Sequence, residues 1–214
     1  MLQFELLKNH AGMVLIGDYL TLRELHTLVH KVNEDSPMIH DKEGPFLGLA
    51  YDIRKAYEQQ RRVIDPPEHI PEIGPRFGVE ILWPVLLFQT RLLRRALAWV
   101  PHGPGDQALV YALEHTVQTA IEAAFKDLAP TVVSAWQNLD PVQPEADDQL
   151  DARGALFCSW PKARRRRDFA NLLESFSPLY AFAYEVNVGR GERLLLDPAE
   201  IELWRGAEWP DPKW

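Results

Sequence analysis

The chain has little of what marks an enzyme or a metalloprotein by sequence alone. A single cysteine, Cys158, stands among 214 residues, which excludes an intramolecular disulfide and a zinc site built of cysteines. It lies on an apolar segment, where a free cysteine usually packs as a small hydrophobe. There is no Gly-x-Ser-x-Gly elbow, no glycine-rich phosphate loop ending in Lys-Ser or Lys-Thr, and no Gly-x-Gly-x-x-Gly dinucleotide fingerprint. These absences exclude the enzyme classes that carry such motifs. They do not exclude enzymes that lack a sequence signature.

Long hydrophobic runs are missing as well. The longest unbroken one covers residues 81–88, far below the ~20 residues that a membrane-spanning helix needs. Residues 1–8 alternate between polar and apolar types and lack the basic start and apolar stretch of a signal peptide. We therefore expect no membrane association and a location in the reducing cytoplasm.

Positive charge is in deficit. The chain has 23 Lys and Arg against 31 Asp and Glu, a formal net charge of −8, which argues against broad affinity for nucleic acid. The two signs are unevenly placed, because an acidic segment over residues 140–151 is followed by a basic run over 162–167. At 46% hydrophobic and 25% charged residues, the composition is that of an ordinary globular protein.

Hydrophobic periodicity predicts both strands and helices. Strands are expected over residues 2–8, 13–18, 77–83, 155–160 and 180–188, the last joined by a glycine-bearing turn to a partner strand over 192–196. Helices are expected over residues 21–32, 46–62, 84–100, 106–128, 131–139 and 162–176, with a short one after Asp197. Residues 140–151 are predicted to be a loop.

This pattern predicts an α+β fold, in which a mostly antiparallel sheet of hairpins packs against several helices, including a long central helical pair. The N-terminal and C-terminal hairpins are expected to share one sheet, so that residues 1–214 form a single α+β domain. The best candidate for a boundary inside it is the proline-rich connector over residues 63–76.

Two histidines four residues apart are the best candidates for chemistry. His26 and His30 share one face of a predicted helix, so both could reach one metal ion, or one could act as a general base. Tyr51 and Arg54 lie on the next predicted helix, where the arginine could hold an anionic substrate. The pair lacks the glutamate that follows the first histidine in a zinc-protease helix. Ordinary half-exposed histidines are therefore the preferred interpretation, and no metal or cofactor is expected.

The run from Arg164 to Arg167 is the sharpest local feature. It could bind phosphate, nucleic acid or an acidic partner. Four consecutive helical positions spread around the helix, however, so the four side chains cannot all face one ligand. The preferred interpretation is that Arg164, Arg165, Arg166 and Arg167 are solvated or paired within the chain, with the acidic segment 140–151 as the nearest source of counter-charge.

Trp204, Trp209 and Trp214 crowd the last part of the chain. Chain ends are usually polar and frayed, so an aromatic end either docks on its own domain or meets a partner. Docking is the preferred interpretation, because exposed aromatic patches are rare on monomers. A dimer contact or another protein partner is the alternative.

The segment Leu49-Ala50-Tyr51-Asp52-Ile53-Arg54-Lys55-Ala56-Tyr57-Glu58, placed after a hairpin that carries Gly17-Asp18, resembles an uncharacterised family of small bacterial proteins. The resemblance covers the first third of the chain. It implies a bacterial, cytoplasmic protein and brings no activity or site residues with it.

Together these features favour a non-catalytic protein-binding or regulatory module. Such a module would be a homo-oligomer, or an inhibitor of a basic protein in the manner of an immunity factor or antitoxin. The first alternative is an enzyme with a cryptic site built around His26, His30 and the Tyr51–Arg54 segment. The second alternative is nucleic-acid binding through Arg164–Arg167.

Overall fold

Four strands form one antiparallel sheet. The computed structural model describes residues 1–143, 145–190 and 195–212. Strands β1 (Gln3–Leu6), β2 (Gly12–Gly17), β3 (Arg62–Ile64) and β4 (Arg76–Leu82) are arranged in the order β1-β2-β4-β3, and each neighbouring pair is antiparallel. Leu15 in β2 pairs with Phe4 on one side and with Val79 on the other. Every residue of β2 is buried, so this strand is the centre around which the sheet is built.

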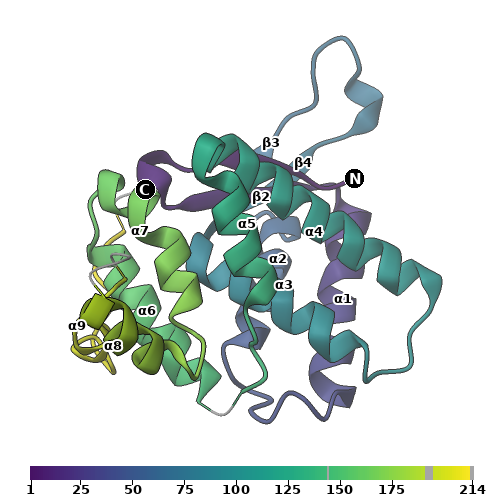
Figure 1. The fold of residues 1–214 in the computed structure, drawn as a ribbon. Helices are drawn as coiled ribbons and strands as arrows, with labels where there is room; N and C mark the ends of the chain where they lie inside the picture. The colour runs from purple at the N-terminus through teal and green to yellow at the C-terminus, as the bar shows by residue number, and fades with distance from the viewer. Residues whose placement is uncertain (144, 191–194, 213–214) are drawn as a thin grey trace.

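Helices surround the sheet and make up the larger part of the fold (Figure 1). They are α1 (Tyr19–Asp35), α2 (Phe46–Tyr57), α3 (Trp83–Leu97), α4 (Pro104–Phe125), α5 (Ala129–Asn138), α6 (Ala146–Ser159), α7 (Lys162–Glu174), α8 (Tyr180–Arg190) and α9 (Pro198–Glu202). Helix α2 packs against β4 and against α1, whereas α4 packs beside β1. Since α3 and α4 are long and contact each other, the predicted α+β fold with a central helical pair is confirmed.

Local sequence explains where several helices begin. Asp18 caps α1 by accepting a hydrogen bond from the Thr21 N–H at 2.9 Å. Pro84 stands in the first turn of α3, where its missing N–H costs nothing. Asp106, in the first turn of α4, accepts the N–H of the N-cap residue Gly103 at 3.1 Å.

The strand predicted over residues 155–160 is wrong. Residues 155–159 are the second half of α6, which also takes up residues 146–151 of the predicted acidic loop. The helix is buried continuously from Ala152 to Cys158. A short apolar run without a polar face has no distinguishing period, so it fits a buried helix as well as a buried strand.

The strand predicted over residues 180–188 is wrong too, because these residues form most of α8. Their alternation of aromatic and small residues does not reflect burial, since Tyr180 alone is buried among the residues of this helix. The predicted C-terminal hairpin is therefore wrong, and so is its place in the sheet. Residues 191–194 of its second strand lie outside the described residues, and residues 195–196 form no strand.

The helix predicted over residues 46–62 is shorter than expected. Gln59 adopts a left-handed φ of 61°, which ends the helical path. Arg62 enters β3 and forms an ion pair with Glu5 of β1, with 2.7 Å between Nη1 and Oε2. Strand β3 was not expected, because it has three residues and follows a sequence that reads as helix.

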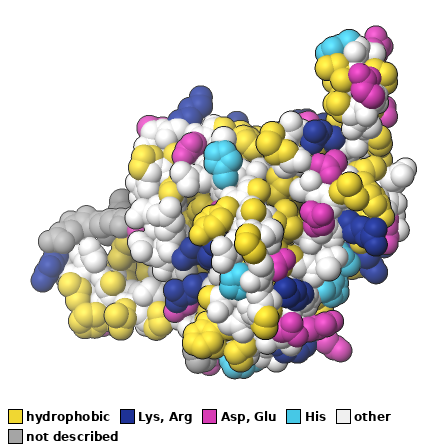
Figure 2. Space-filling model, turned by 90° about the vertical axis from the view of Figure 1, so that its right-hand side faces the viewer, with side chains coloured by type: hydrophobic (Ala, Val, Ile, Leu, Met, Phe, Trp, Pro, Cys, Tyr) yellow, Lys and Arg dark blue, Asp and Glu magenta, His cyan; other side chains and the backbone are white. Residues whose placement is uncertain are grey.

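Strands β3 and β4 are joined by residues 65–75, which we call the arm. The arm projects from the body of the molecule as a long loop (Figure 1) and stands clear of it in the space-filling view, with hydrophobic, histidine and acidic side chains on its surface (Figure 2). Four of its eleven residues are prolines. Local hydrogen bonds hold its tip, from the Ile70 N–H to the Pro67 carbonyl at 3.0 Å and from the Gly74 N–H to the Pro71 carbonyl at 3.1 Å. Gly74 has φ 69°, a conformation that glycine adopts without strain.

One cluster of buried apolar side chains forms the core, and it includes residues on both sides of the arm. Trp83, Phe125, Phe157 and Phe169 lie in it, and the rings of Phe125 and Phe169 stack with their centroids 5.3 Å apart. None of residues 65–75 belongs to this cluster. The arm therefore takes no part in packing the body.

Candidate functional site

The two histidines of the predicted cryptic site lie side by side. The ring centroids of His26 and His30 are 4.5 Å apart on α1. The His26 ring is also 5.7 Å from that of Tyr57 on α2, which in turn packs edge-on against Tyr19 at 5.6 Å. The spacing of four residues thus brings the histidines together as expected, and the packing of α1 on α2 adds a tyrosine that the sequence did not indicate.

Electrostatics favour the neutral form of His26. Its burial lowers the pKa, as do His30 and the positive charge of Arg54, whereas Glu58 acts in the opposite direction. Burial and the charge of Glu58 raise the pKa of the Tyr57 hydroxyl. A neutral imidazole can accept a proton at pH 7, so His26 has the protonation state that a general base needs.

Tyr51 lies apart from this arrangement. Its ring is 48% exposed and is covered by the ammonium of Lys55 at 5.3 Å and the guanidinium of Arg54 at 5.6 Å. These contacts are cation–π pairs between neighbouring turns of one helix. The tyrosine that contacts His26 is therefore Tyr57, whereas Tyr51 lies on the outer side of α2.

Metal-ligating groups do not cluster around the histidines. Across the described residues, no group of three or more His, Cys, Asp and Glu side chains is placed to hold a metal ion. Two neighbouring imidazoles alone leave half of a tetrahedral coordination sphere to water.

The four consecutive arginines have four different surroundings. Arg164 pairs with Glu200 at 2.7 Å and with Asp168 at 3.4 Å. Arg167 pairs with Asp168 at 2.7 Å. The remaining exposed member, Arg166, pairs with Asp127 of the turn between α4 and α5. These carboxylates, rather than the acidic segment 140–151, supply the counter-charge.

Arg165 is buried, with 2% of its surface exposed. Its guanidinium donates to the carbonyls of Phe157 at 3.1 Å and Cys158 at 2.9 Å, at the end of α6, and to that of Asn9 at 3.4 Å. It also lies 5.0 Å from the Phe157 ring centroid. A side chain enclosed in this way ties α7 to α6 and to the turn between β1 and β2, and it cannot reach a phosphate backbone.

The aromatic tail docks on the body over the residues that the structure describes. The indole N–H of Trp209 donates to Oδ1 of Asp151 at 2.7 Å, and its ring lies over Gly154 on α6. Trp204 is partly buried against the core. Trp214 lies outside the described residues. The preferred interpretation is thus confirmed for Trp204 and Trp209, which leaves neither as a free aromatic side chain.

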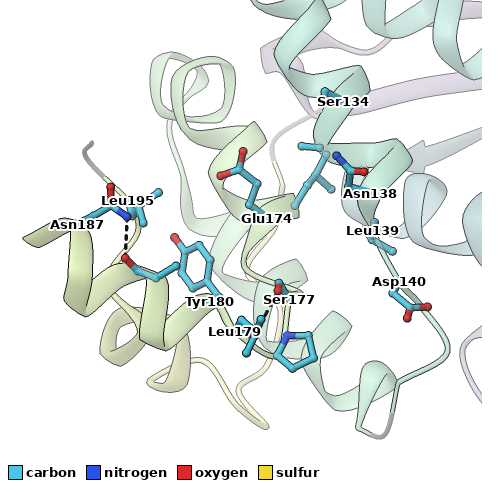
Figure 3. Close-up of a pocket in the computed structure, with 14 residues that line it drawn as sticks. Ser134, Asn138, Leu139, Asp140, Glu174, Ser177, Leu179, Tyr180, Asn187 and Leu195 are labelled. Carbon is cyan, nitrogen blue, oxygen red and sulfur yellow. Dashed lines mark hydrogen bonds between the residues drawn. The ribbon is translucent and has the colours of Figure 1, made fainter. Parts of the chain in front are cut away.

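A pocket of about 430 Å³ lies between α5, α7 and α8. Figure 3 shows Asn138, Glu174 and Tyr180 around it, each from a different helix. The described lining residues include no histidine, cysteine, lysine or arginine. The pocket has the size of a small-molecule site, and its described lining includes the hydroxyls of Ser134, Ser177 and Tyr180 and the carboxylates of Asp140 and Glu174.

A second hollow opens beside the root of the arm. This hollow, which we call the N-terminal groove, has a volume of about 620 Å³ and lies between the sheet and α4. Its apolar lining residues are Met1, Leu2, Phe4, Ile16, Ile64 and Ala112. Polar groups from β4 and α4 line it as well, among them Arg76, His115 and Thr119. The groove and the arm share a boundary, since Ile64 and Arg76 are the residues from which the arm leaves the sheet.

The arm carries apolar side chains that nothing in the body covers. Ile70 is 38% exposed and Ile73 is 49% exposed. Asp65, Glu68 and Glu72 are exposed beside them. Isolated exposed isoleucines are common, and here two of them lie on one projecting, proline-rich hairpin. The sequence signalled this segment only as a proline-rich connector.

The sheet and the helices make this an α+β protein. A family model described as a domain of unknown function, DUF6904, matches residues 2–181. The chain therefore belongs to this family. The match extends far beyond the first third of the chain, where the resemblance lay, and it ends within α8.

No curated protein and no solved structure matches the chain. Among the described residues, no helix is both long and apolar enough to cross a bilayer.

Proposed function

We propose that this protein is a non-catalytic protein-binding module and that the arm is its partner-binding element. The observation that carries the proposal is the exposure of Ile70 and Ile73 on a hairpin that contributes nothing to the core. The arm does not pack against the core, yet it exposes two isoleucine side chains to water. A complex in which a partner buries these side chains would explain why the arm carries them.

The build of the arm supports this role. Its four prolines restrict the backbone before any partner is met, so less conformational entropy is lost on binding. Full burial of an isoleucine side chain contributes about 1.5–3 kcal/mol. Burial of the two isoleucines at the tip can thus supply part of the free energy of binding. The residues on either side of the tip would form the rest of the interface.

The finer form of the proposal is regulatory. With a net charge of −8, the protein would approach a basic target quickly, as an immunity factor or antitoxin does, and its acidic arm would make first contact. Self-association into a homo-oligomer is the other form. We further propose that the protein works in the cytoplasm of a bacterium; its lone buried cysteine suits a reducing compartment.

Native mass spectrometry of the protein purified gently from its host tests the proposal. The wild-type chain is compared with a variant in which residues 65–75 are replaced by Asn-Gly, a two-residue turn that suits an antiparallel hairpin. We expect the wild type to carry a second polypeptide, either another copy or a different protein, and the variant to appear as a bare monomer with an unchanged circular dichroism spectrum.

A matched control is Leu203→Ser, which removes an apolar side chain that is 82% exposed on the other side of the fold. It should keep the complex. A bare wild-type monomer, or a complex that survives loss of the arm, would disprove the proposed role of the arm.

An enzyme built around His26 is the second candidate, favoured by the neutral imidazole in contact with Tyr57 and by the nearby charge of Arg54. Its test is a screen for turnover in which His26→Ala abolishes the activity and Tyr51→Phe does not. Equal activity in wild type and His26→Ala would end this reading. No observation favours nucleic-acid binding through Arg164–Arg167, because each of these arginines has partners within the chain.

A further inference from the structure

We infer that the partner of the arm is a second copy of this chain, whose N-terminal groove receives it. The inference rests on the proposed function and adds the identity of the partner. In the dimer each arm would lie in the groove of the other protomer, so that one contact occurs twice around a twofold axis. Closed twofold dimers of this kind are the commonest protein assemblies.

The first argument is the match of apolar surfaces. The groove is lined by Leu2, Phe4 and Ile16 of the first two strands. The arm offers Ile70 and Ile73 at its tip. The apolar tip of the arm and the apolar lining of the groove are thus of the same kind, and each would cover the other.

The second argument is charge. The arm carries the carboxylates of Asp65, Glu68 and Glu72 and no lysine or arginine. The groove is bordered by Arg76 and His115. Its one acidic lining residue, Glu5, is already engaged by Arg62 at 2.7 Å. An acidic arm therefore meets a rim that carries the positive charge of Arg76, which gives the contact both attraction and register.

The third argument is position. Because Ile64 and Arg76 both anchor the arm and line the groove, the two surfaces lie next to each other on the same edge of the molecule. Each leg of the arm has about five residues and can reach roughly 17 Å. A twofold axis beside the root would bring both arms into both grooves at once, without asking either protomer to unfold.

The single cysteine of the chain allows a direct test. Cys158 is buried, and burial raises the pKa of its thiol to about 11, so cysteines introduced at the surface would be the reactive thiols. We would place one in the arm of one preparation, Ile73→Cys, and one in the groove of another, Thr119→Cys, with an affinity tag on the first alone. The two proteins are mixed, left to exchange and oxidised mildly.

We expect a disulfide-linked heterodimer in at least tenfold excess over the control mixture, in which Leu203→Cys replaces Ile73→Cys. Since each protein carries only one new thiol, no intramolecular bond can produce this product. Heterodimer at the level of the control would overturn the inference.

A charge pair provides the second test. Thr119→Glu puts a carboxylate where the acidic arm would lie, and Thr119→Lys puts an ammonium there; both lose the same hydrogen bond from the threonine hydroxyl to the His115 carbonyl. In sedimentation equilibrium we expect wild type and Thr119→Lys to be dimers, and Thr119→Glu to dissociate with a Kd at least tenfold higher. Equal dissociation constants for Thr119→Glu and Thr119→Lys would contradict the placement of the acidic arm in the groove.

The two proposals fail separately. A wild-type monomer that holds a different protein through its arm would overturn the dimer and leave the binding module standing. A wild-type monomer whose arm can be removed without loss of any complex would overturn both.

Discussion

The indole of Trp209 lies close enough to α6 that a methyl group at Gly154 would overlap the ring. The indole N–H is fixed at the same time by Asp151, one turn earlier on the helix. Two residues more than fifty positions apart thereby fix where the C-terminal tail rests.

Gly154→Ala should displace this ring. We expect a loss of about 1–3 kcal/mol in the free energy of unfolding, as for other overpacked sites, measured by urea titration. The double variant with Trp209→Ala should lose less than the sum of the two single variants, because the clash and the contact involve the same atoms. Gly105→Ala, in the first turn of α4 with open space around it, is the matched control and should be neutral or slightly stabilising. Equal effects at the two glycines would contradict this packing.

The arginine run should separate into one structural residue and one dispensable residue. Arg165→Ala leaves the carbonyls of Phe157 and Cys158 without their donor in a buried place, so we expect a loss of about 3 kcal/mol in urea unfolding. Arg167→Ala, two positions along the same helix and exposed, should cause no measurable change. Similar losses for both would mean that the run acts as a single charged surface.

Asp18 should make stability depend on pH. Its burial alone would raise the pKa, but hydrogen bonds from the N-terminal ammonium and from the N–H and hydroxyl of Thr21 outweigh it and hold the pKa well below the usual range. The folded protein thus favours the ionised carboxylate of Asp18, and this preference stabilises the folded state. The stabilisation is present above about pH 4, the usual pKa of an aspartate, and is lost as the pH falls further. We expect Asp18→Asn to cost about 1 kcal/mol at pH 7, and the difference from wild type to narrow below pH 4. If the difference in unfolding free energy between wild type and Asp18→Asn stayed constant below pH 4, the charge of Asp18 would not contribute to stability.

The thiol of Cys158 should be inert in the folded protein. Burial raises its pKa to about 11, with Asp211 adding to the shift and Arg165 opposing it. About one molecule in a thousand would then carry a thiolate at pH 8, and the thiolate is the reacting species. We expect a chromogenic disulfide reagent to react at least a hundredfold more slowly with native protein than with protein in urea. Rapid labelling of the native state would contradict the burial of this side chain and would also remove the basis for the cross-linking test.

The first half of the fold could be read from the sequence because its signals are local and consistent. The first strand of the N-terminal hairpin alternates in polarity, the second is a short apolar run, and a turn separates them. Pro84 marks the start of α3 at the end of β4. Likewise, the contact between His26 and His30 follows from helical geometry alone, since residues four apart lie on one face.

Two segments of the second half could not be read in this way, although α4, α5 and α7 were predicted close to their observed positions. The alternation from Tyr180 to Val188 matches the period of a strand, yet α8 lies on the surface and buries almost none of it. Residues 155–159 are buried on nearly all sides, so no polar face reveals their helical period. Both errors arose because the sequence pattern was interpreted as the burial pattern of a strand, which neither segment has.

The candidate site was harder still, because it joins distant parts of the chain. The N-terminal groove needs β1, the root of the arm and α4, and none of these segments signals the others in sequence. Tyr57 meets His26 only because α1 and α2 pack together. The prolines of residues 63–76 did point to a special segment, but its projection from the body is a tertiary property. The expectation that residues 1–214 form a single domain stays a prediction.

The docking of the tail on α6 also bears on how the protein is made. Helix α6 precedes Ile201 and Trp209 in the chain, so it is synthesised before the residues that pack on it. At roughly 5–20 residues per second, about 50 residues separate Gly154 from Trp209 by a few seconds of synthesis. Helix α6 therefore reaches its final packing only after the last residues of the tail have left the ribosome.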